Sequence, residues 1–332
     1  MPDSGDVTVR LLEPDEAGLL VELIRRCYRD TYIDPTFYDV DAVRERLASG
    51  RLSSVGAFVG DDALAGHMGI TTRPWGGNTA DAGMTLVDPA QRGHGIARQV
   101  AVGLAQQAVA LGLVGVHDYP VTVHAATQRL AKGYGADTGL MLANMPADVS
   151  FERMETPAPG QRTSSLIRWL PFGRPPEREV HLPDRYADIL KTLYDEANLL
   201  RTPRVRDAAL LGGGSEIHTV VDLRRNIARL VVMVAGEDLV ARVASETEFA
   251  RQRGVLVAHV DLSLSDRTTP AATEALRTLR YSFAGLLPEY RNGDVLRLQW
   301  LSVDAESSAV TVLSSDTTRA IQAFVLADRA GL

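Results

Sequence analysis

The chain has 332 residues, 45% of them hydrophobic and 23% charged, with a formal net charge of −7 at pH 7. This length suits two domains of about 150 residues, and the composition excludes a chain that is disordered throughout. The acidic balance argues against a general nucleic-acid binder. The single cysteine, Cys27, excludes an intramolecular disulfide and a cysteine-rich zinc site. The seven histidines are scattered without metal-ligand spacing, so we predict no metal.

The first residues carry acidic and small side chains and no apolar stretch, so no signal peptide is visible. No apolar run approaches the ~18 residues that a membrane span needs. We therefore expect a cytoplasmic protein without a membrane or nucleic-acid partner.

The first half of the chain alternates predicted strands and helices. A strand over 7–12 is followed by Glu13-Pro-Asp-Glu16, which is typical of a helix start, and apolar residues then recur at helical spacing to about Arg29. The next expected elements are a helix over 40–49, strands over 54–59, 63–72 and 79–87, a helix from Gly95 to Gly112, a strand over 114–121, a helix over 125–133 and a strand over 138–145. Turns are expected at Gly60-Asp61-Asp62 and Trp75-Gly76-Gly77-Asn78.

A stretch rich in proline and glycine, residues 156–176, predicts a connection between a first domain over 1–155 and a second over 177–332. It contains a short apolar strand at Leu166 to Leu170. The second domain repeats the order of elements more weakly. Its expected elements are a helix over 183–198, strands over 216–223 and 227–235, a helix over 239–253, a strand over 255–264, a helix over 270–279 and a strand over 295–301.

Two short segments indicate that the second half is a duplicate of the first. Ala125-Ala-Thr-Gln-Arg-Leu130 and Ala271-Ala-Thr-Glu-Ala-Leu276 follow matching strands and begin 146 residues apart. A repeat of that length has the size of a domain, whereas a solenoid repeats over 20–50 residues.

The segment Leu86-Val-Asp-Pro-Ala-Gln-Arg-Gly-His-Gly-Ile-Ala97 joins a strand to a long helix. Gly93 and Gly95 allow the backbone to turn so that its N–H groups point inward. Together with the positive end of the helix dipole, these N–H groups favour a bound anion such as a pyrophosphate, and Arg92 adds a positive charge. The alternative is an ordinary glycine turn into a helix. Neither a Walker-type Gly-Lys-Ser/Thr nor a dinucleotide Gly-x-Gly-x-x-Gly is present.

The same segment resembles the acyl-CoA pyrophosphate loop of the GNAT acetyltransferase superfamily, Arg/Gln-x-x-Gly-x-Gly/Ala. Arg92, Gly95 and Ala97 fill its fixed positions, and Val87-x-Pro89 precedes them. The resemblance covers residues 7 to 153 and implies a mixed α/β sheet with acetyl-CoA or another acyl-CoA as co-substrate. Thr122-Val-His124 and Gln128 resemble a bacterial subgroup of that family. The cofactor-binding residues implied are Leu86, Val87, Arg92, Gly93, His94, Gly95, Ile96, Ala97, His124 and Gln128.

The family resemblance also suggests the catalytic groups. Members often carry a carboxylate on the strand before the loop, here Asp81, which would take the proton of the nucleophile directly or through a water; the alternative is a solvated acid at a strand start. The tyrosine that members often use as general acid is missing, because its position falls on Ala131. Tyr134 lies three residues later, on another face, so we expect it to pack in the core; the alternative is that it acts as the general acid. We expect His124 to assist the thiol, or else to cap its helix.

Residues that the fold would place around the acceptor form a third group. The acceptor-pocket candidates are Tyr28, Tyr32, Phe37, Tyr38, His67, His117 and Asp118. Because neighbouring strand residues point to opposite faces, at most one of the last two faces the cleft. Ordinary core packing is the alternative for all of them. Cys27 lies on the apolar side of its helix and is interpreted as a buried, inert thiol.

The second half lacks the loop, since only Gly236-Glu237-Asp238 stands in its place and two acids would repel phosphates. We interpret 177–332 as a degenerate GNAT-like domain that completes a sheet, walls the acceptor cleft or binds a partner. The leading hypothesis is an acyl-CoA-dependent N-acetyltransferase, a monomer or homodimer, that acetylates a small amine by direct transfer in a ternary complex. The alternatives are transfer to a carrier-protein thiol, a hydroxyl or a protein amine, and an acyl-CoA-binding sensor or scaffold without turnover.

Overall fold

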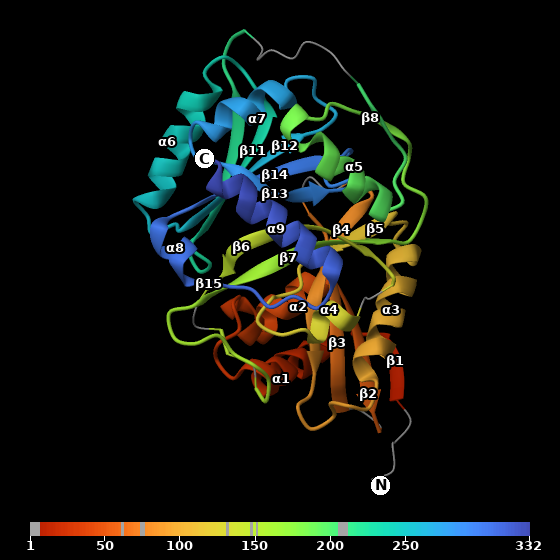
Figure 1. The fold of residues 1–332 in the computed structure, drawn as a ribbon. Coiled ribbons are helices and arrows are strands. Elements are labelled where there is room, and N and C mark those ends of the chain that lie inside the picture. The colour runs from red at the N-terminus through yellow and green to blue at the C-terminus, as the bar shows by residue number, and fades with distance from the viewer. Residues whose placement is uncertain are drawn as a thin grey trace.

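The computed structural model describes residues 7–60, 63–73, 77–130, 133–146, 149–150, 152–204 and 212–332, without the side chains of 306–310. The chain is mixed α/β, with one large mixed sheet running through the molecule and helices packed against its faces (Figure 1). The predicted turn residues Asp61, Asp62, Trp75 and Gly76, and the alanine at the family's tyrosine position, Ala131, lie outside the described residues.

The large sheet has 13 strands and contains strands from both halves of the chain, in the order β1-β2-β3-β4-β5-β7-β6-β13-β14-β12-β11-β10, with β15 paired to β7. Its first-half strands are β1 (Val7–Leu11), β2 (Leu52–Val59), β3 (Ala63–Thr71), β4 (Thr79–Val87), β5 (Gly115–Asp118), β6 (Ala136–Met145) and β7 (Arg162–Pro171). Its later strands are β10 (Glu216–Asp222), β11 (Ile227–Val234), β12 (Val257–Ser263), β13 (Ser282–Leu287), β14 (Val295–Leu301) and β15 (Ala309–Val310). Strands β8 (Arg178–Val180) and β9 (Arg201–Pro203) form a separate pair.

Helices cover the sheet on both sides (Figure 1). The α-helices are α1 (Ala17–Tyr28), α2 (Val40–Ala48), α3 (Ile96–Ala110), α4 (Ala126–Leu130), α5 (Ala187–Glu196), α6 (Leu239–Arg251), α7 (Thr269–Arg277), α8 (Val303–Ser308) and α9 (Asp316–Ala330). Short 3-10 turns, Pro14–Glu16 and Asp184–Tyr186, lead into α1 and α5, and a third covers Pro35–Tyr38. The apolar stripe expected on the first helix is buried, with Leu20, Leu23 and Ile24 inaccessible to solvent.

Strands β4 and β5 are parallel but remain paired over a short distance. Their register runs from Thr79 opposite Gly115 to Asp81 opposite His117. Beyond Asp81, β4 pairs only with β3 among the described residues, while β5 pairs on its other side with β7. The backbone edge of β4 after Asp81 therefore faces open space.

The proline-rich stretch contributes a central strand. The short strand expected at Leu166 to Leu170 extends over Arg162–Pro171 as β7 and lies between β5 and β6. It is antiparallel to both, with Trp169 opposite His117 on one side and Ala136 on the other.

The second half repeats the order and pairing of the first. β11 is followed by α6 and by β12, which is parallel to β11, and β14 lies between β12 and β13 as β7 lies between β5 and β6. One difference is that β11 and β12 stay paired over five residue pairs, from Ile227 opposite Val257 to Val231 opposite Asp261. Over these five pairs, β11 and β12 do not separate as β4 and β5 do after Asp81.

The two halves join where β6 meets β13, with Gly139 opposite Gly285. A Cβ atom on Gly139 would lie 2.4 Å from the carbonyl oxygen of Ala284, and one on Gly285 would lie 2.6 Å from the Cα of Gly139. Only glycine allows this close crossing of two backbones.

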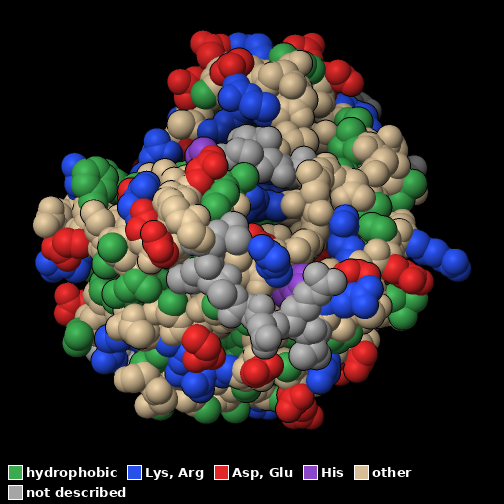
Figure 2. All heavy atoms as spheres, turned by 90° about the horizontal axis from the view of Figure 1, so that it is seen from above, with side chains coloured by type: hydrophobic (Ala, Val, Ile, Leu, Met, Phe, Trp, Pro, Cys, Tyr) green, Lys and Arg blue, Asp and Glu red, His purple; other side chains and the backbone are tan. Residues whose placement is uncertain are grey.

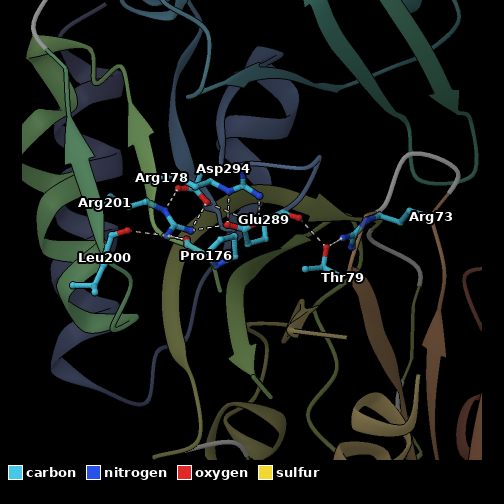
Figure 3. A network of polar contacts seen from close by, with 8 residues as sticks. All are labelled: Arg73, Thr79, Pro176, Arg178, Leu200, Arg201, Glu289 and Asp294. Carbon is cyan, nitrogen blue, oxygen red and sulfur yellow. Dashed lines mark hydrogen bonds and ion pairs between the residues drawn. The ribbon is translucent and has the colours of Figure 1, made fainter. Parts of the chain in front are cut away.

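The turn between β13 and β14 is anchored by buried ion pairs (Figure 3). Arg201 donates to Asp294 Oδ2 at 2.6 Å and to Glu289 Oε1 at 2.9 Å, and Arg178 donates to Glu289 Oε2 at 2.6 Å. Glu289 and Asp294 are inaccessible to solvent. On its other side the Glu289 carbonyl accepts a hydrogen bond of 3.0 Å from Thr79 Oγ1 on β4. The turn thus connects the second half to the strand that opens in the first.

We predict that Glu289→Ala lowers the free energy of unfolding by about 3–5 kcal/mol, because it leaves two arginines without their shared buried carboxylate. Urea denaturation gives the value. Glu274→Ala is the matched control, since its ion pair of 3.3 Å with Arg185 is exposed and such pairs contribute little. Equal midpoints for the two variants would contradict the anchoring role.

Candidate active site

A cavity of about 950 Å³ opens where β4 and β5 part. Its walls come from both halves of the chain. Residues of α1, β4, the loop before α3 and the end of β5 line one part, and residues of β10, β11, β12 and β14 together with Tyr290 line the other. Figure 2 shows acidic and basic side chains interspersed over the face seen from above.

The predicted anion loop lies at one end of this cavity. Gly93 and Gly95 have φ angles of 89° and 78°, in the left-handed region that glycine adopts without strain. Gly95 is the N-cap of α3, and no side chain caps this helix end. A Cβ atom on either glycine would meet nothing within 4 Å. The N–H groups of the first turn of α3 therefore face open space.

Neighbouring contacts fix the position of the loop. Asp88 accepts hydrogen bonds from the backbone N–H of Ala90 at 2.9 Å and from Arg26 Nε at 2.6 Å. Arg92, which lines the cavity, donates from Nε to the carbonyl of Val87 at 3.3 Å and bonds the carbonyl of Glu152. Of the predicted cofactor residues, Leu86, Val87, Arg92, Gly93, Gly95, Ile96 and Ala97 line the cavity, whereas His94 is exposed outside it.

A bulge in β4 lies between the loop and Asp81. Met84 has a φ angle of 53°, and the pairing with β3 shifts between His67 and Gly69. The buried ring of His67 holds this bulge: Nδ1 lies 3.0 Å from the Met84 carbonyl oxygen and Nε2 lies 2.9 Å from Ser54 Oγ. Burial lowers the pKa of His67 to about 4, so the ring is neutral near pH 7. His67 is thus placed behind β4 and does not line the cavity.

Asp81 is the last β4 residue paired with β5, and its carboxylate lines the cavity. It forms an ion pair with Arg73 and accepts a hydrogen bond of 3.1 Å from the Tyr119 hydroxyl. Burial, reinforced by the Asp81 charge, holds the pKa of Tyr119 well above its usual range. Tyr119 therefore stays protonated and donates to the carboxylate.

The adjacent pair on β5 is divided between two faces. Asp118 lines the cavity, and burial raises the pKa of its carboxyl to about 6. His117 is packed away from the cavity, with its ring 5.2 Å from Trp169 and 5.1 Å from Tyr290 between centroids. Burial holds its pKa well below the usual range.

Gln128 lies on α4 and His124 lies just before it, but the two side chains have different surroundings. His124 lines the cavity, and burial lowers its pKa. Gln128 instead donates to the carbonyls of His124 at 3.0 Å and Val312 at 2.9 Å, and its Oε1 accepts from the Ser314 N–H at 3.0 Å. Gln128 therefore links α4 to the C-terminal segment and does not line the cavity.

Aromatic side chains of the first helices form part of the wall. Tyr28 and Tyr32 pack edge to face with ring centroids 4.9 Å apart, and Tyr32 lies 5.7 Å from Phe37. These three line the cavity, while the Tyr38 hydroxyl stands behind them and accepts a 2.8 Å hydrogen bond from the Tyr32 N–H. Cys27 also borders the cavity, and burial raises the pKa of its thiol to about 11, so it is protonated.

Several cavity residues were not expected from the sequence. Tyr119 belongs to the first half, and the second half adds Arg229, His259, Tyr290 and Arg297. Arg73, the ion-pair partner of Asp81, was also not expected, although it does not line the cavity. The expectation that Tyr134 packs in the core is wrong: its side chain is 67% exposed, and it does not line the cavity. For Arg229, His259 and Arg297 the sequence did contain a signal: each is a polar residue within a largely apolar strand.

Residues 19–135 match the model of the Acetyltransferase (GNAT) family. No curated protein matches the chain.

Among solved structures, the chain is similar to the ribosomal-protein-S18-alanine N-acetyltransferase from Escherichia coli, with 14% identity, a TM-score of 0.40, and 52% of this chain and 97% of that one covered. It is also similar to a GNAT-family acetyltransferase from Streptococcus pneumoniae, with 17% identity, a TM-score of 0.39, and 49% of this chain and 98% of that one covered. A third similar structure is yncA, a putative acetyltransferase from Salmonella typhimurium, solved with its cofactor acetyl-CoA. It has 14% identity and a TM-score of 0.42, with 52% of this chain and 97% of that one covered. Each likeness covers about half of the chain.

In the part of the chain that the structure describes, no helix is long and apolar enough to cross a membrane. The same residues contain no group of three or more His, Cys, Asp or Glu side chains placed to hold a metal ion.

We predict that His67→Asn weakens the pH dependence of stability below neutrality. The folded pKa of about 4 is below the unfolded value of about 6.5, so the unfolded state binds the extra proton and stability falls as the pH drops through this window. Between pH 7 and pH 5 the variant should lose about 2 kcal/mol less than the wild type, while its amide can still donate to the Met84 carbonyl.

Urea denaturation at the two pH values measures this difference. His94→Asn, at an exposed histidine, serves as the control and should keep the wild-type dependence. An unchanged slope in His67→Asn would show that this ring does not resist protonation.

Proposed function

We propose that the protein is an acyl-CoA-dependent N-acetyltransferase that acetylates a small amine by direct transfer. One observation carries the proposal: a single cavity runs from the uncapped N-terminus of α3, along the open edge of β4, to the carboxylate of Asp81. One space can therefore hold the cofactor and the acceptor together. The family match over 19–135 supports the same chemistry.

The loop end fits the pyrophosphate of an acyl-CoA. The helix N-terminus offers N–H donors and a positive dipole end, and the space above Gly93 and Gly95 is open. The unpaired edge of β4 from Ala82 to Val87 can bond the amide groups of the pantetheine arm as a neighbouring strand would. An acyl-CoA supplies an activated thioester, so the protein needs no covalent intermediate.

Asp81 and Tyr119 stand where an acceptor amine would enter. An ionised Asp81 can hold an ammonium group and take its proton directly or through a water. The Tyr119 hydroxyl donates to the same carboxylate and fixes its orientation. Asp118, with a pKa near 6, is a second carboxyl suited to proton transfer near neutral pH. His124 also lines the cavity, and its proposed role is to assist the thiol of the cofactor.

The role proposed for the second half is to wall the acceptor end of this cavity as a tandem, degenerate GNAT-like domain. The repeated order of strands and helices supports duplication. Asp238 caps the turn at Ser215, accepting its N–H at 2.6 Å where the first half has its anion loop. A carboxylate at this point would repel phosphates.

The Arg73–Asp81 ion pair favours a second candidate function, an acyl-CoA-binding sensor without turnover. The Arg73 guanidinium already occupies the Asp81 carboxylate, the group that the transferase needs for the acceptor amine. Transfer to a carrier-protein thiol, a hydroxyl or a protein amine would use the same cofactor end with a different acceptor.

We predict that acetyl-CoA raises the melting temperature of the protein by mass action and that Gly95→Glu abolishes this shift. The new carboxylate would occupy the open space at the helix N-terminus and repel the pyrophosphate. Gly112→Glu is a matched control, because Gly112 ends the same helix with a φ angle of 70° and equally open surroundings. Thermal melts with and without acetyl-CoA measure both. A retained shift in folded Gly95→Glu would place the cofactor elsewhere.

We further predict that Asp81→Asn lowers kcat by roughly 10²-fold, the usual scale for a general base, while the acetyl-CoA melting shift persists. His124→Ala should weaken cofactor binding and turnover together. Thiol release over a panel of amines gives the rates, and Asp41→Asn, at an exposed acid of α2, is the control. Near-normal rates in both test variants would leave the reaction to proximity alone and refute both assignments.

A further inference from the structure

Three strands of the second half carry a polar face opposite their apolar one. On β11, β12 and β14 the alternate residues Leu230, Val260 and Leu298 are buried in the core beneath the helices. The opposite face presents the buried or half-buried polar residues Arg229, His259, Asp261, Arg297 and Gln299. Arg229, His259 and Arg297 line the cavity described above.

The charges on this face are not all compensated. Arg297 binds Asp261 through two hydrogen bonds of 2.7 Å, so this pair is neutral as a unit. Arg225 and Asp222, which also line the cavity, form an ion pair with 3.7 Å between Nε and Oδ2. Within the described residues no carboxylate lies within ion-pair distance of Arg229, whose guanidinium donates to the Tyr290 hydroxyl at 2.7 Å. A guanidinium has five N–H donors, so Arg229 retains capacity for a ligand.

A second polar side chain stands beside Arg229. His259 is opposite Arg229 in the parallel register of β11 and β12, so both side chains leave the sheet on the same face. The His259 ring is 97% buried, and in the described residues its Nε2 atom has no hydrogen-bond partner. Burial lowers the pKa of His259 to about 3, so the ring is neutral and adds no charge.

Tyr290 connects this group with the proposed acceptor end. Its hydroxyl accepts from Arg229, and the guanidinium carbon of Arg73 lies 4.0 Å from its ring centroid. Arg73 in turn holds Asp81. A single tyrosine ring thus separates the Arg229 guanidinium from the Arg73–Asp81 pair.

We propose that Arg229, His259 and Tyr290 form an anion subsite that binds a carboxylate on the acceptor while its amine is held at Asp81. The proposal rests on the proposed function and names its substrate class: small amines that also carry a carboxylate, as amino acids do. Arg229 offers the positive charge and a planar donor pair suited to a carboxylate. His259 and the Tyr290 hydroxyl add neutral hydrogen-bonding groups.

The charge count favours a monoanion. Apart from Arg229, the arginines of this end are paired with Asp81, Asp222 and Asp261. Arg229 therefore keeps a single positive charge that no ion pair of the described residues offsets, which matches a carboxylate better than a doubly charged phosphate monoester.

The test compares acceptors in pairs that differ by the carboxylate. Lysine is paired with 1,5-diaminopentane, alanine with ethylamine and 4-aminobutyrate with propylamine, and phosphoethanolamine represents a phosphate. Each probe is assayed by the melting temperature in the presence of CoA and by thiol release from acetyl-CoA. We expect at least one carboxylate member to be preferred by roughly 10²-fold, the scale of a lost charged hydrogen bond.

Arg229→Gln should abolish this preference, and Arg229→Lys should keep part of it because the charge remains. Arg253→Gln, at an exposed arginine of the second half that stacks on Phe249, should leave it unchanged. The acetyl-CoA melting shift verifies that each variant is folded.

Two results would overturn the subsite: no pair showing a carboxylate preference in either assay, or a preference that survives in Arg229→Gln. A stronger effect of phosphoethanolamine than of any carboxylate would overturn the assignment to a monoanion. A carboxylate-dependent melting shift without thiol release would support the subsite and refute the transferase. The two proposals therefore fail separately.

Discussion

The structure depends on the short pairing of β4 and β5. Their ladder ends at Asp81 and His117, and β7 holds β5 from the other side, so β5 cannot follow β4 further. The backbone groups of β4 beyond this point need partners, and the bulge at Met84, supported by the buried ring of His67, aims them toward the cavity. Because Asp81 is the last paired residue, its carboxylate stands at the point where the strands part.

The second half differs from the first at this same place. β11 and β12 remain paired through Val231 and Asp261, so their backbone groups bond each other and leave no open edge. Their polar face can form a wall, and the pairing of β6 with β13 at Gly139 and Gly285 brings the two parts of the sheet close enough for that wall to border the first half's cavity. The ion pairs of Glu289 and Asp294 hold the turn that inserts Tyr290. The first half thus opens the cavity, and strands of the second half wall it.

Part of this arrangement could be predicted from the sequence. The loop before α3 could be recognised because its backbone has positive φ angles at Gly93 and Gly95, which favour glycine at these positions. The order of strands and helices in the first half follows from apolar periodicity. Strand β13 and helix α9 were not expected: all six residues of β13 are buried, so its sequence does not alternate between polar and apolar residues. The contact of Tyr119 with Asp81 joins positions 38 residues apart, and the Arg229–Tyr290 contact joins positions 61 apart. Such contacts depend on sheet order, which local patterns do not encode.

Buried arginines that are paired with a carboxylate have a structural role in this molecule, whereas one without such a partner is a candidate for ligand binding. Desolvating a guanidinium is costly unless a carboxylate and hydrogen bonds compensate. Four buried arginines have that compensation within the protein. They are Arg168 with Asp137, Arg201 with Glu289 and Asp294, Arg277 with Asp328, and Arg297 with Asp261. These pairs fix strands and turns in place. Arg229 shares its polar face with Arg297, but it donates to a neutral hydroxyl, and no carboxylate of the described residues lies within ion-pair distance of it. The positive charge of Arg229 is therefore available to an anionic ligand at the part of the cavity that β11, β12 and β14 line.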